Sequence, residues 1–162
     1  MIIGVMADSH DNLFNIEKAV DLFNQKKVNI VLHAGDFIAP FVTRKLNKLK
    51  CPLVGVFGNN DGEKKGLKEK ILSIGGSVYE PPFSFEKEGK KILLLHDPAK
   101  IEEEDFDLFD LIVCGHTHQS EVKKTKKALL VNPGECGGWL TGKSTIGFVD
   151  LDTLEVEIKS LD

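Results

Sequence analysis

The stretch Ile2-Ile3-Gly4-Val5-Met6-Ala7-Asp8-Ser9-His10 guides the interpretation of the whole chain. Its apolar first part predicts a buried strand, and Asp8 and His10 stand where that strand ends. Residues two apart on extended backbone have Cα atoms about 6–7 Å apart and side chains on the same side. A carboxylate and an imidazole in this arrangement can bind one ion of Mn, Fe, Ni, Co or Zn. The alternative is a surface turn in which Asp11 or Asn12 caps the following helix.

Composition indicates an ordinary globular protein. The chain has 162 residues, 41% hydrophobic and 28% charged, which predicts one domain covering residues 1–162. A formal net charge of −4 argues against a long nucleic acid as partner. Three cysteines, an odd number, and the lack of a signal peptide favour free thiols in a reducing cytoplasm. No apolar stretch approaches the ~18–20 residues that a membrane span needs, so we expect no membrane partner.

Strands and helices alternate in the first half of the sequence. Apolar residues at helical spacing predict three helices, at 13–27, at 40–48 and around 67–72. Short apolar runs predict strands at 30–32 and 52–57. This β-α-β rhythm is typical of a parallel sheet with right-handed crossovers.

The second half is richer in strands. Residues 83–87 and 91–95 flank Glu88-Gly89-Lys90 and predict a hairpin. A further strand is expected at 110–113, and mostly antiparallel strands at 128–131, 145–149 and 156–158. The basic run 123–127 is interpreted as a solvated hairpin turn. We therefore expect an α/β fold in which two mixed β-sheets pack together, with helices outside.

The ends of the buried strands share a chemical pattern. Each carries Asp, His or Asn, in the segments Asp8-Ser9-His10, His33-Ala34-Gly35-Asp36, Gly58-Asn59-Asn60-Asp61, His96 and Gly115-His116-Thr117-His118. In open α/β sheets, ligands bind beyond the carboxyl ends of the strands. The pattern therefore predicts a metal site built from several loops.

These motifs, in this order, resemble those of the calcineurin-like metallophosphoesterases. The resemblance covers nearly the whole chain and is closest to the small cap-less phosphodiesterase branch, in which one αββα four-layer sandwich is the entire enzyme. It implies a hydrolase with two divalent transition-metal ions, drawn from Mn, Ni, Fe or Zn, with Mn or Ni favoured. In such enzymes a hydroxide that bridges the two ions attacks the phosphodiester in line.

The resemblance also implies the ligands of each ion. One ion would be held by Asp8, His10, Asp36 and His118. The other would be held by Asp36, Asn59, His96 and His116. The residue types agree, because the shared ligand must be anionic, as Asp36 is, and a neutral amide at Asn59 limits the total negative charge. Catalytic roles are predicted for Asp36 and Asn60.

Three positions depart from the family pattern. Asn60 stands where the family often has His, and an amide can donate a hydrogen bond but not a proton. General acid catalysis is worth ~10²–10⁴-fold, so we expect a preference for phosphodiesters with good leaving groups over alkyl phosphomonoesters. Asp97 follows His96 where Gly is more common, and would either crowd the site or bind the metal ligands from outside. Glu135 stands where Ser is common.

Four residues near these motifs receive no catalytic role. His33 is interpreted as structural, with its imidazole hydrogen-bonded to a neighbouring loop. Cys114 is expected to be a small buried hydrophobe. Cys136 is expected to be reachable by solvent, and Trp139 to belong to an exposed rim or to a dimer contact.

Three functions are compatible with the motifs. The leading hypothesis is a phosphodiesterase acting on a small phosphodiester or nucleotide. The alternative is a non-catalytic protein-binding scaffold, as in a retromer subunit that shares the fold and has lost part of its metal set. The complete ligand set favours catalysis. A DNA nuclease is disfavoured by the acidic balance and by the lack of length for a capping region. The resemblance also implies a homodimer or homotetramer.

Overall fold

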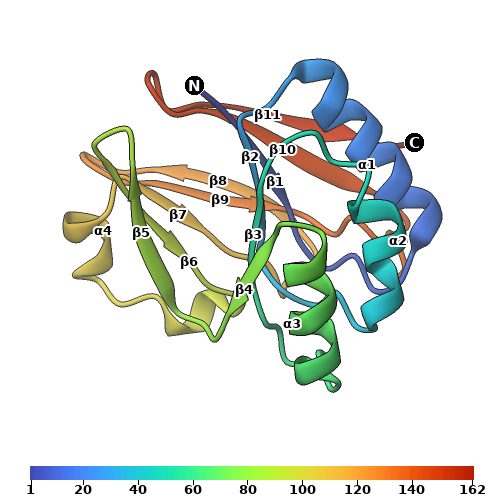
Figure 1. Cartoon of the computed structure of the whole chain (residues 1–162). Helices are drawn as coiled ribbons and strands as arrows, with labels where there is room; N and C mark the ends of the chain where they lie inside the picture. Colours follow the sequence, from blue (N-terminus) through green and yellow to red (C-terminus); the bar gives the residue numbers. More distant parts are fainter.

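The computed structural model describes all residues, 1–162, and contains two β-sheets packed against each other with helices on their outer sides (Figure 1). The first sheet has the strand order β11-β10-β1-β2-β3-β4, and the second the order β5-β6-β7-β9-β8. The predicted arrangement of two mixed sheets with helices outside is therefore confirmed. None of the helices combines the length and the apolar character that crossing a bilayer requires.

The first sheet is parallel at its centre. Its strands are β1 (Ile2–Met6), β2 (Ile30–His33), β3 (Leu53–Val56), β4 (Ser77–Tyr79), β10 (Thr145–Asp150) and β11 (Glu155–Ser160). Strands β1 to β4 run parallel, with Ile3 opposite Ile30 and Val31 opposite Leu53, as the β-α-β rhythm predicts. Strand β10 pairs antiparallel with β1, and β11 with β10. The expectation missed β4, because only Val78 of its three residues is buried.

The second sheet corrects one expectation. Its strands are β5 (Phe83–Lys87), β6 (Lys90–Leu94), β7 (Leu111–Val113), β8 (Ser120–Lys124) and β9 (Leu129–Pro133). The hairpin of β5 and β6 is confirmed. Strands β6, β7 and β9 run parallel, so β9, one of the strands expected to be mostly antiparallel, is antiparallel only to β8. Lys123 and Lys124 belong to the exposed strand β8, and the turn begins only after them.

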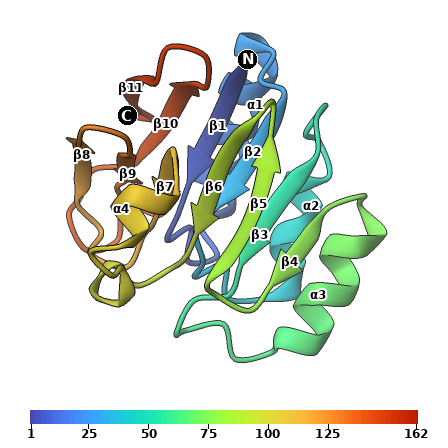
Figure 2. The same ribbon diagram turned by 90° about the vertical axis from the view of Figure 1, so that its left-hand side faces the viewer.

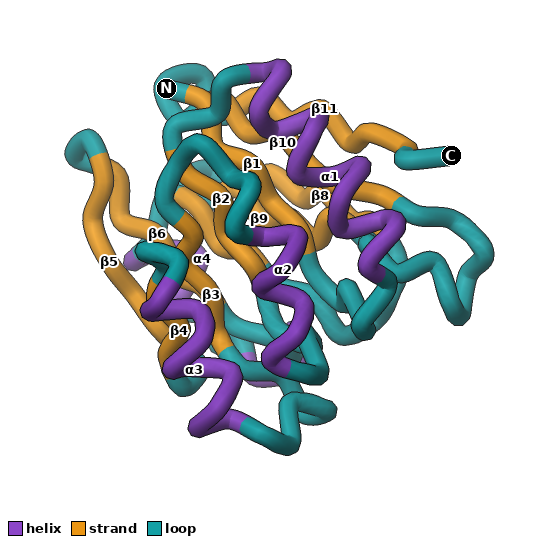
Figure 3. The backbone as a smooth tube through the Cα atoms, turned by 45° about the vertical axis from the view of Figure 1, so that its right-hand side comes forward, coloured by secondary structure: helices purple, strands orange, loops and turns teal.

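The helices form the outer layers. One layer, α1 (Leu13–Lys26), the 3-10 turn η1 (Pro40–Val42), α2 (Thr43–Leu46) and α3 (Lys64–Ser73), covers the first sheet (Figure 3). The short η2 (Pro98–Lys100) and α4 (Asp105–Leu108) lie beside the second sheet (Figure 2). The single helix expected at 40–48 is thus split into η1 and α2, and Phe41 is 42% exposed.

The start of α1 combines the two interpretations of the first loop. Asn12 caps the helix, and its side chain accepts a hydrogen bond from the backbone N–H of Asn15 at 3.2 Å. Capping thus occurs directly after Asp8 and His10, so it does not compete with a role for these two residues in metal binding.

One hydrophobic core lies between the two sheets. It contains buried residues of both, among them Val5 and Leu32 of the first sheet and Leu94 and Val131 of the second. A larger core centred on Phe23 lies between the first sheet and its helices. Because close-packed interiors are stiff, these contacts fix the strand ends of one sheet relative to those of the other.

Candidate metal centre

The loops that follow β1, β2, β3, β6 and β7 meet at one end of the two sheets. A continuous set of contacts of 3.8 Å or less connects all the predicted metal ligands, namely Asp8, His10, Asp36, Asn59, His96, His116 and His118. These contacts divide into two groups.

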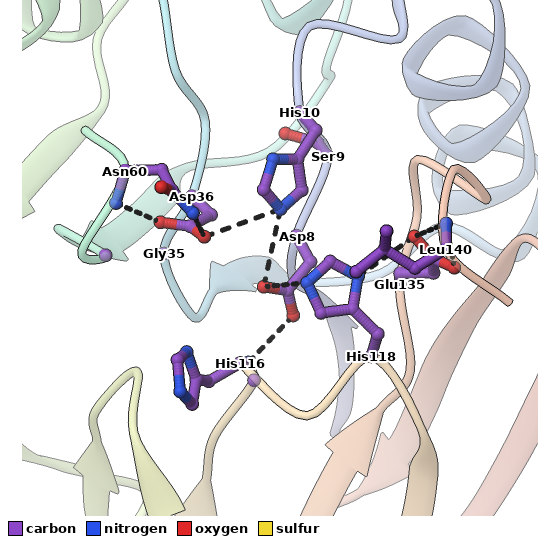
Figure 4. A network of polar contacts seen from close by, with 12 residues as sticks. Asp8, Ser9, His10, Gly35, Asp36, Asn60, His116, His118, Glu135 and Leu140 are labelled. Carbon is purple, nitrogen blue, oxygen red and sulfur yellow. Dashed lines mark hydrogen bonds and ion pairs between the residues drawn. The ribbon is translucent and has the colours of Figure 1, made fainter. Parts of the chain in front are cut away.

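The first group surrounds Asp8, at the end of β1 (Figure 4). Asp8 Oδ1 lies 3.8 Å from His10 Nε2 and 3.7 Å from His118 Nε2. One ligand atom from each of these residues lies within 4.8 Å of the other two, which is close enough for a single ion. The loops after β1 and β7 therefore form one candidate metal site.

The second group surrounds the side-chain oxygen of Asn59, in the loop after β3. His96 Nε2 lies 2.8 Å from Asn59 Oδ1, and His116 Nδ1 lies 3.0 Å from the same oxygen. The two imidazole nitrogens are 3.3 Å apart. An amide oxygen and two imidazoles thus converge from three different loops.

Asp36 lies between the two groups. Its Oδ2 atom is 3.4 Å from His10 Nε2 and 3.5 Å from His96 Nε2, so a single carboxylate oxygen faces both. Ligand atoms of Asp8, Asp36 and His96 also lie within 4.8 Å of one another. The motifs assign Asp8 only to the first ion, but Asp8 also lies close to His96 of the second group.

Two observations fit a metal ion at the first group. Asp8 Oδ1 and His10 Nε2 are buried and have no hydrogen-bond partner, which is costly unless another ligand satisfies them. The Asp8 carboxylate raises the pKa of His10, partial burial opposes this, and Asp36 adds to the increase. The centre thus attracts positive charge, and its oxygen and imidazole donors suit Mn, Fe, Ni or Zn.

The backbone of the centre is strained. Asp8, His10, Asp36, His116 and His118 all have left-handed backbone, with φ of 49°, 41°, 58°, 71° and 61°. Such residues cost about 1–3 kcal/mol each and concentrate at functional sites. The assumption of extended backbone at Asp8 and His10 was wrong, since β1 ends at Met6. A tight loop makes the two side chains converge instead.

Asp61 holds two of the loops together, a role that the sequence interpretation missed. Its buried carboxylate accepts hydrogen bonds from the backbone N–H groups of Asp36 (3.1 Å), Ile38 (2.7 Å) and Gly58 (2.7 Å). Burial raises the pKa of Asp61, and the bonds from Gly58 and Ile38 oppose this increase. The sequence feature that could have indicated this role is the position of Asp61 at the end of the segment Gly58-Asn59-Asn60-Asp61.

Two imidazoles have outer partners that the sequence did not identify. His96 Nδ1 lies 2.8 Å from the carbonyl oxygen of Ala34, and His118 Nδ1 lies 3.0 Å from Glu135 Oε2. Each contact leaves Nε2 facing the centre. Such partners typically orient metal-binding imidazoles and fix the position of their proton.

Asn60 lies directly against the carboxylate of Asp36. Its backbone N–H donates to Asp36 Oδ1 and its side-chain amide to Asp36 Oδ2, both at 2.8 Å (Figure 4). Asp97, in contrast, contacts no predicted ligand: its side chain accepts a 2.9 Å hydrogen bond from the backbone of Ala99. It therefore does not hold the metal ligands from outside.

The residues without a predicted catalytic role are mostly as expected. His33 is buried, stacks on Phe37 with ring centroids 3.5 Å apart, and has its Nε2 3.0 Å from Ser9 Oγ in the neighbouring loop. Cys114 is buried, as expected. Cys136 is fully buried as well, so the expectation that solvent reaches it was wrong, and burial raises its pKa to about 12.

A cleft of about 310 Å³ opens beside the second group. Asn59, His96 and His116 form one side of it. The other lining residues combine cationic, anionic and apolar side chains, including Phe57, Lys64, Glu80, Pro82, Leu95, Asp97 and Lys100. The cleft is large enough for a small organic group next to the metal ligands.

Comparisons with known proteins agree with this geometry. The model of the calcineurin-like phosphoesterase superfamily domain matches residues 1–154. A phosphodiesterase of Methanocaldococcus jannaschii is 37% identical over 159 residues, which are 96% of each chain. The structure of an archaeal phosphodiesterase superposes with a TM-score of 0.93 at 36% identity and covers 99% of each chain. The Zn²⁺ complex of Vps29 from Entamoeba histolytica, 16% identical, covers 100% of each chain with a TM-score of 0.66 and shares the fold.

Proposed function

The chain belongs to the calcineurin-like phosphoesterase superfamily, and from this premise we propose that it is a phosphodiesterase with a dinuclear metal centre. The observation that carries the proposal is the placement of Asp36 Oδ2 within 3.5 Å of imidazoles from both groups. A carboxylate oxygen in that position can bind two ions at once. The relative of this chain from Methanocaldococcus jannaschii is named a phosphodiesterase, which supports the same reaction for this chain.

We assign the ligands to two ions according to the motifs, although Asp8 also lies near Asp36 and His96. Asp8, His10, Asp36 and His118 would hold one ion, and Asp36, Asn59, His96 and His116 the other. When bound, the ions supply a nucleophile at neutral pH and neutralise charge on the phosphoryl oxygens. We favour Mn²⁺ or Ni²⁺, as the family resemblance implies; the oxygen and imidazole donors, with no thiolate, suit these ions and also Fe and Zn.

Asn60 determines which leaving groups the enzyme accepts. Its amide lies 2.8 Å from Asp36 Oδ2 and can donate a hydrogen bond to a phosphoryl oxygen beside that carboxylate. It cannot protonate the departing oxygen, so the leaving group must be stable as an anion. The cleft beside His96 and His116 accepts a small phosphodiester or nucleotide, and its size and the net charge of −4 disfavour a long nucleic acid.

A protein-binding scaffold of the same fold is the second candidate. Vps29 shares the fold, and exposed Trp139 and Leu140 offer an apolar contact surface. The complete donor set and the unsatisfied buried atoms of Asp8 and His10 favour the enzyme, because a docking surface does not need them.

Three further proposals follow from the same site and core. Residues 1–162 act as one domain, which the core shared by the two sheets supports. The three unpaired cysteines support a reducing compartment such as the cytoplasm. Trp139 and Leu140, 65% and 76% exposed, are candidate contacts of a homodimer or homotetramer.

The test of the proposed function is metal-dependent hydrolysis of bis(p-nitrophenyl) phosphate. We expect metal-stripped protein to be inactive and to recover turnover when Mn²⁺ or Ni²⁺ is added, with two ions bound per chain by calorimetry. Zn²⁺ serves as the comparison ion. Metal binding without turnover would favour the scaffold, and no metal binding would refute the site itself.

The role of Asn60 predicts a gain of function. The Asn60→His variant is expected to hydrolyse an alkyl phosphate ester about 10²-fold faster than the wild type, because an imidazolium can protonate the leaving oxygen. Its rate on bis(p-nitrophenyl) phosphate should change little, since that leaving group needs no proton. Asn60→Gln, which keeps an amide, is the matched control. An equal gain in Asn60→Gln would mean that side-chain size, not proton donation, limits the wild type.

A further inference from the structure

The carboxylate of Glu135 is completely buried in the loop after β9, where an isolated charge would be unstable. Every contact to it comes from a donor. These donors are His118 Nδ1 at 3.0 Å, the backbone N–H groups of Trp139 at 3.0 Å and Leu140 at 3.1 Å, the Thr141 hydroxyl at 2.7 Å and the Thr141 backbone N–H. Because every partner donates and none accepts, the group acts as a carboxylate that only accepts hydrogen bonds.

The bond to His118 fixes the imidazole in one state. Because the carboxylate accepts from Nδ1, that nitrogen carries the hydrogen and Nε2 keeps its lone pair. Nε2 lies 3.7 Å from Asp8 Oδ1, within the first group of predicted ligands. A carboxylate partner raises the basicity of an imidazole more than a neutral carbonyl does. His118 should therefore bind a metal ion more strongly than His96, whose ring contacts the carbonyl oxygen of Ala34.

The same carboxylate reaches His10 by a second route. Its bonds to the backbone of residues 139–141 hold this loop over the centre, and the Trp139 indole donates to the carbonyl oxygen of His10 at 3.0 Å. The Gly137 backbone N–H also donates to the Asp8 carbonyl oxygen at 3.0 Å. The buried carboxylate thus contacts the side chain of His118 directly and reaches the backbone of His10 through Trp139.

We propose that Glu135 is a positioning residue for the first metal site, which fixes the tautomer of His118 and, through the loop at 139–141, the placement of His10. This inference rests on the proposed dinuclear function and deepens it. The second site has no equivalent anion, since His96 is held by a carbonyl group. The two sites should therefore differ in affinity, with the Asp8 site filling first.

The experiment is calorimetric titration of metal-stripped protein with Mn²⁺ alone. In the wild type we expect two binding steps of unequal affinity. Glu135→Gln should weaken the tighter step by about 10–100-fold, which is the typical effect of removing such a partner, and leave the weaker step unchanged. Thr141→Val removes one hydroxyl donor from the same carboxylate but keeps its contact with His118, so it should weaken the tighter step less than Glu135→Gln does.

A second readout separates positioning from general stability. In ¹⁵N NMR of metal-stripped wild type, His118 should be protonated at Nδ1, and Glu135→Gln should shift it towards a mixture of tautomers. Glu135→Ser serves as the second variant if Glu135→Gln does not fold. If the wild type shows two binding steps and Glu135→Gln changes neither these steps nor the tautomer of His118, the inference about Glu135 is refuted and the proposed function is not. Fewer than two steps in the wild type would refute the proposed function with it.

Discussion

Replacing Asp36 by Asn is expected to reduce hydrolysis of bis(p-nitrophenyl) phosphate by more than about 100-fold, because changes to residues that only support metal ligands already cost up to that much. Asp36 Oδ2 faces imidazoles of both groups at 3.4 and 3.5 Å. An amide lacks the negative charge, and its NH₂ group would repel an ion on one of the two sides. The measurement is kcat/KM at saturating Mn²⁺, together with the number of ions bound.

The matched control for this prediction is Asp21→Asn. Asp21 is exposed on α1, and the substitution changes the net charge by the same amount at a distance from the centre. It should leave activity and metal stoichiometry at wild-type values. If Asp36→Asn kept more than a tenth of the wild-type activity, Asp36 would not be the ligand that the two sites share.

Replacing Gly58 by Ala should also weaken metal binding, through shape rather than charge. A methyl group at Gly58 would overlap the backbone nitrogen and the carboxylate oxygen Oδ1 of Asp36. The loops after β2 and β3 touch at this point, since a Cβ atom on Gly35 would lie 2.9 Å from the Gly58 Cα. Relief of the overlap must move Asp36 or Asn59, and we expect a loss of metal affinity of at least about 10-fold with a loss of stability of about 1–3 kcal/mol.

Gly62→Ala provides the comparison for Gly58→Ala. Gly62 is close in sequence, and a Cβ added there would meet no atom within 4 Å. Calorimetry with Mn²⁺ and urea denaturation, run on both variants, distinguish a local steric effect from a general one. Wild-type metal affinity in Gly58→Ala would show that the two loops are looser than the contacts imply.

The sequence predicts the fold best where an element has a strong pattern of its own. Helix α1 is long and amphipathic, and β2 and β3 are continuous apolar runs between helices, so their types and order were predictable. Strand β4 has one buried residue and β8 has none, so neither shows the alternation that identifies a strand. The direction of β6, β7 and β9 depends on crossovers between short strands, which local pattern does not encode.

The candidate site follows the same rule. Its predicted ligands were visible because each is an Asp, Asn or His directly after an apolar run. The partner of His96 is the backbone carbonyl of Ala34. Every residue type has such a carbonyl, so the sequence does not reveal this contact. Glu135 was noticed only as a departure from the family pattern, because its contact with His118 is set by how two loops pack in space.

The position of β1 between β2 and β10 has a consequence for biosynthesis. A ribosome makes β1 more than 130 residues before β10, so one side of β1 stays an open edge while the strands between them are made. Ile3 and Val5 pack against the second sheet in the finished protein, so they stay accessible until that sheet has been made. His116 and His118 also emerge long after Asp8. Until its last strands are made, the nascent polypeptide therefore has an incomplete donor set and an unpaired strand edge, a feature that generally favours aggregation.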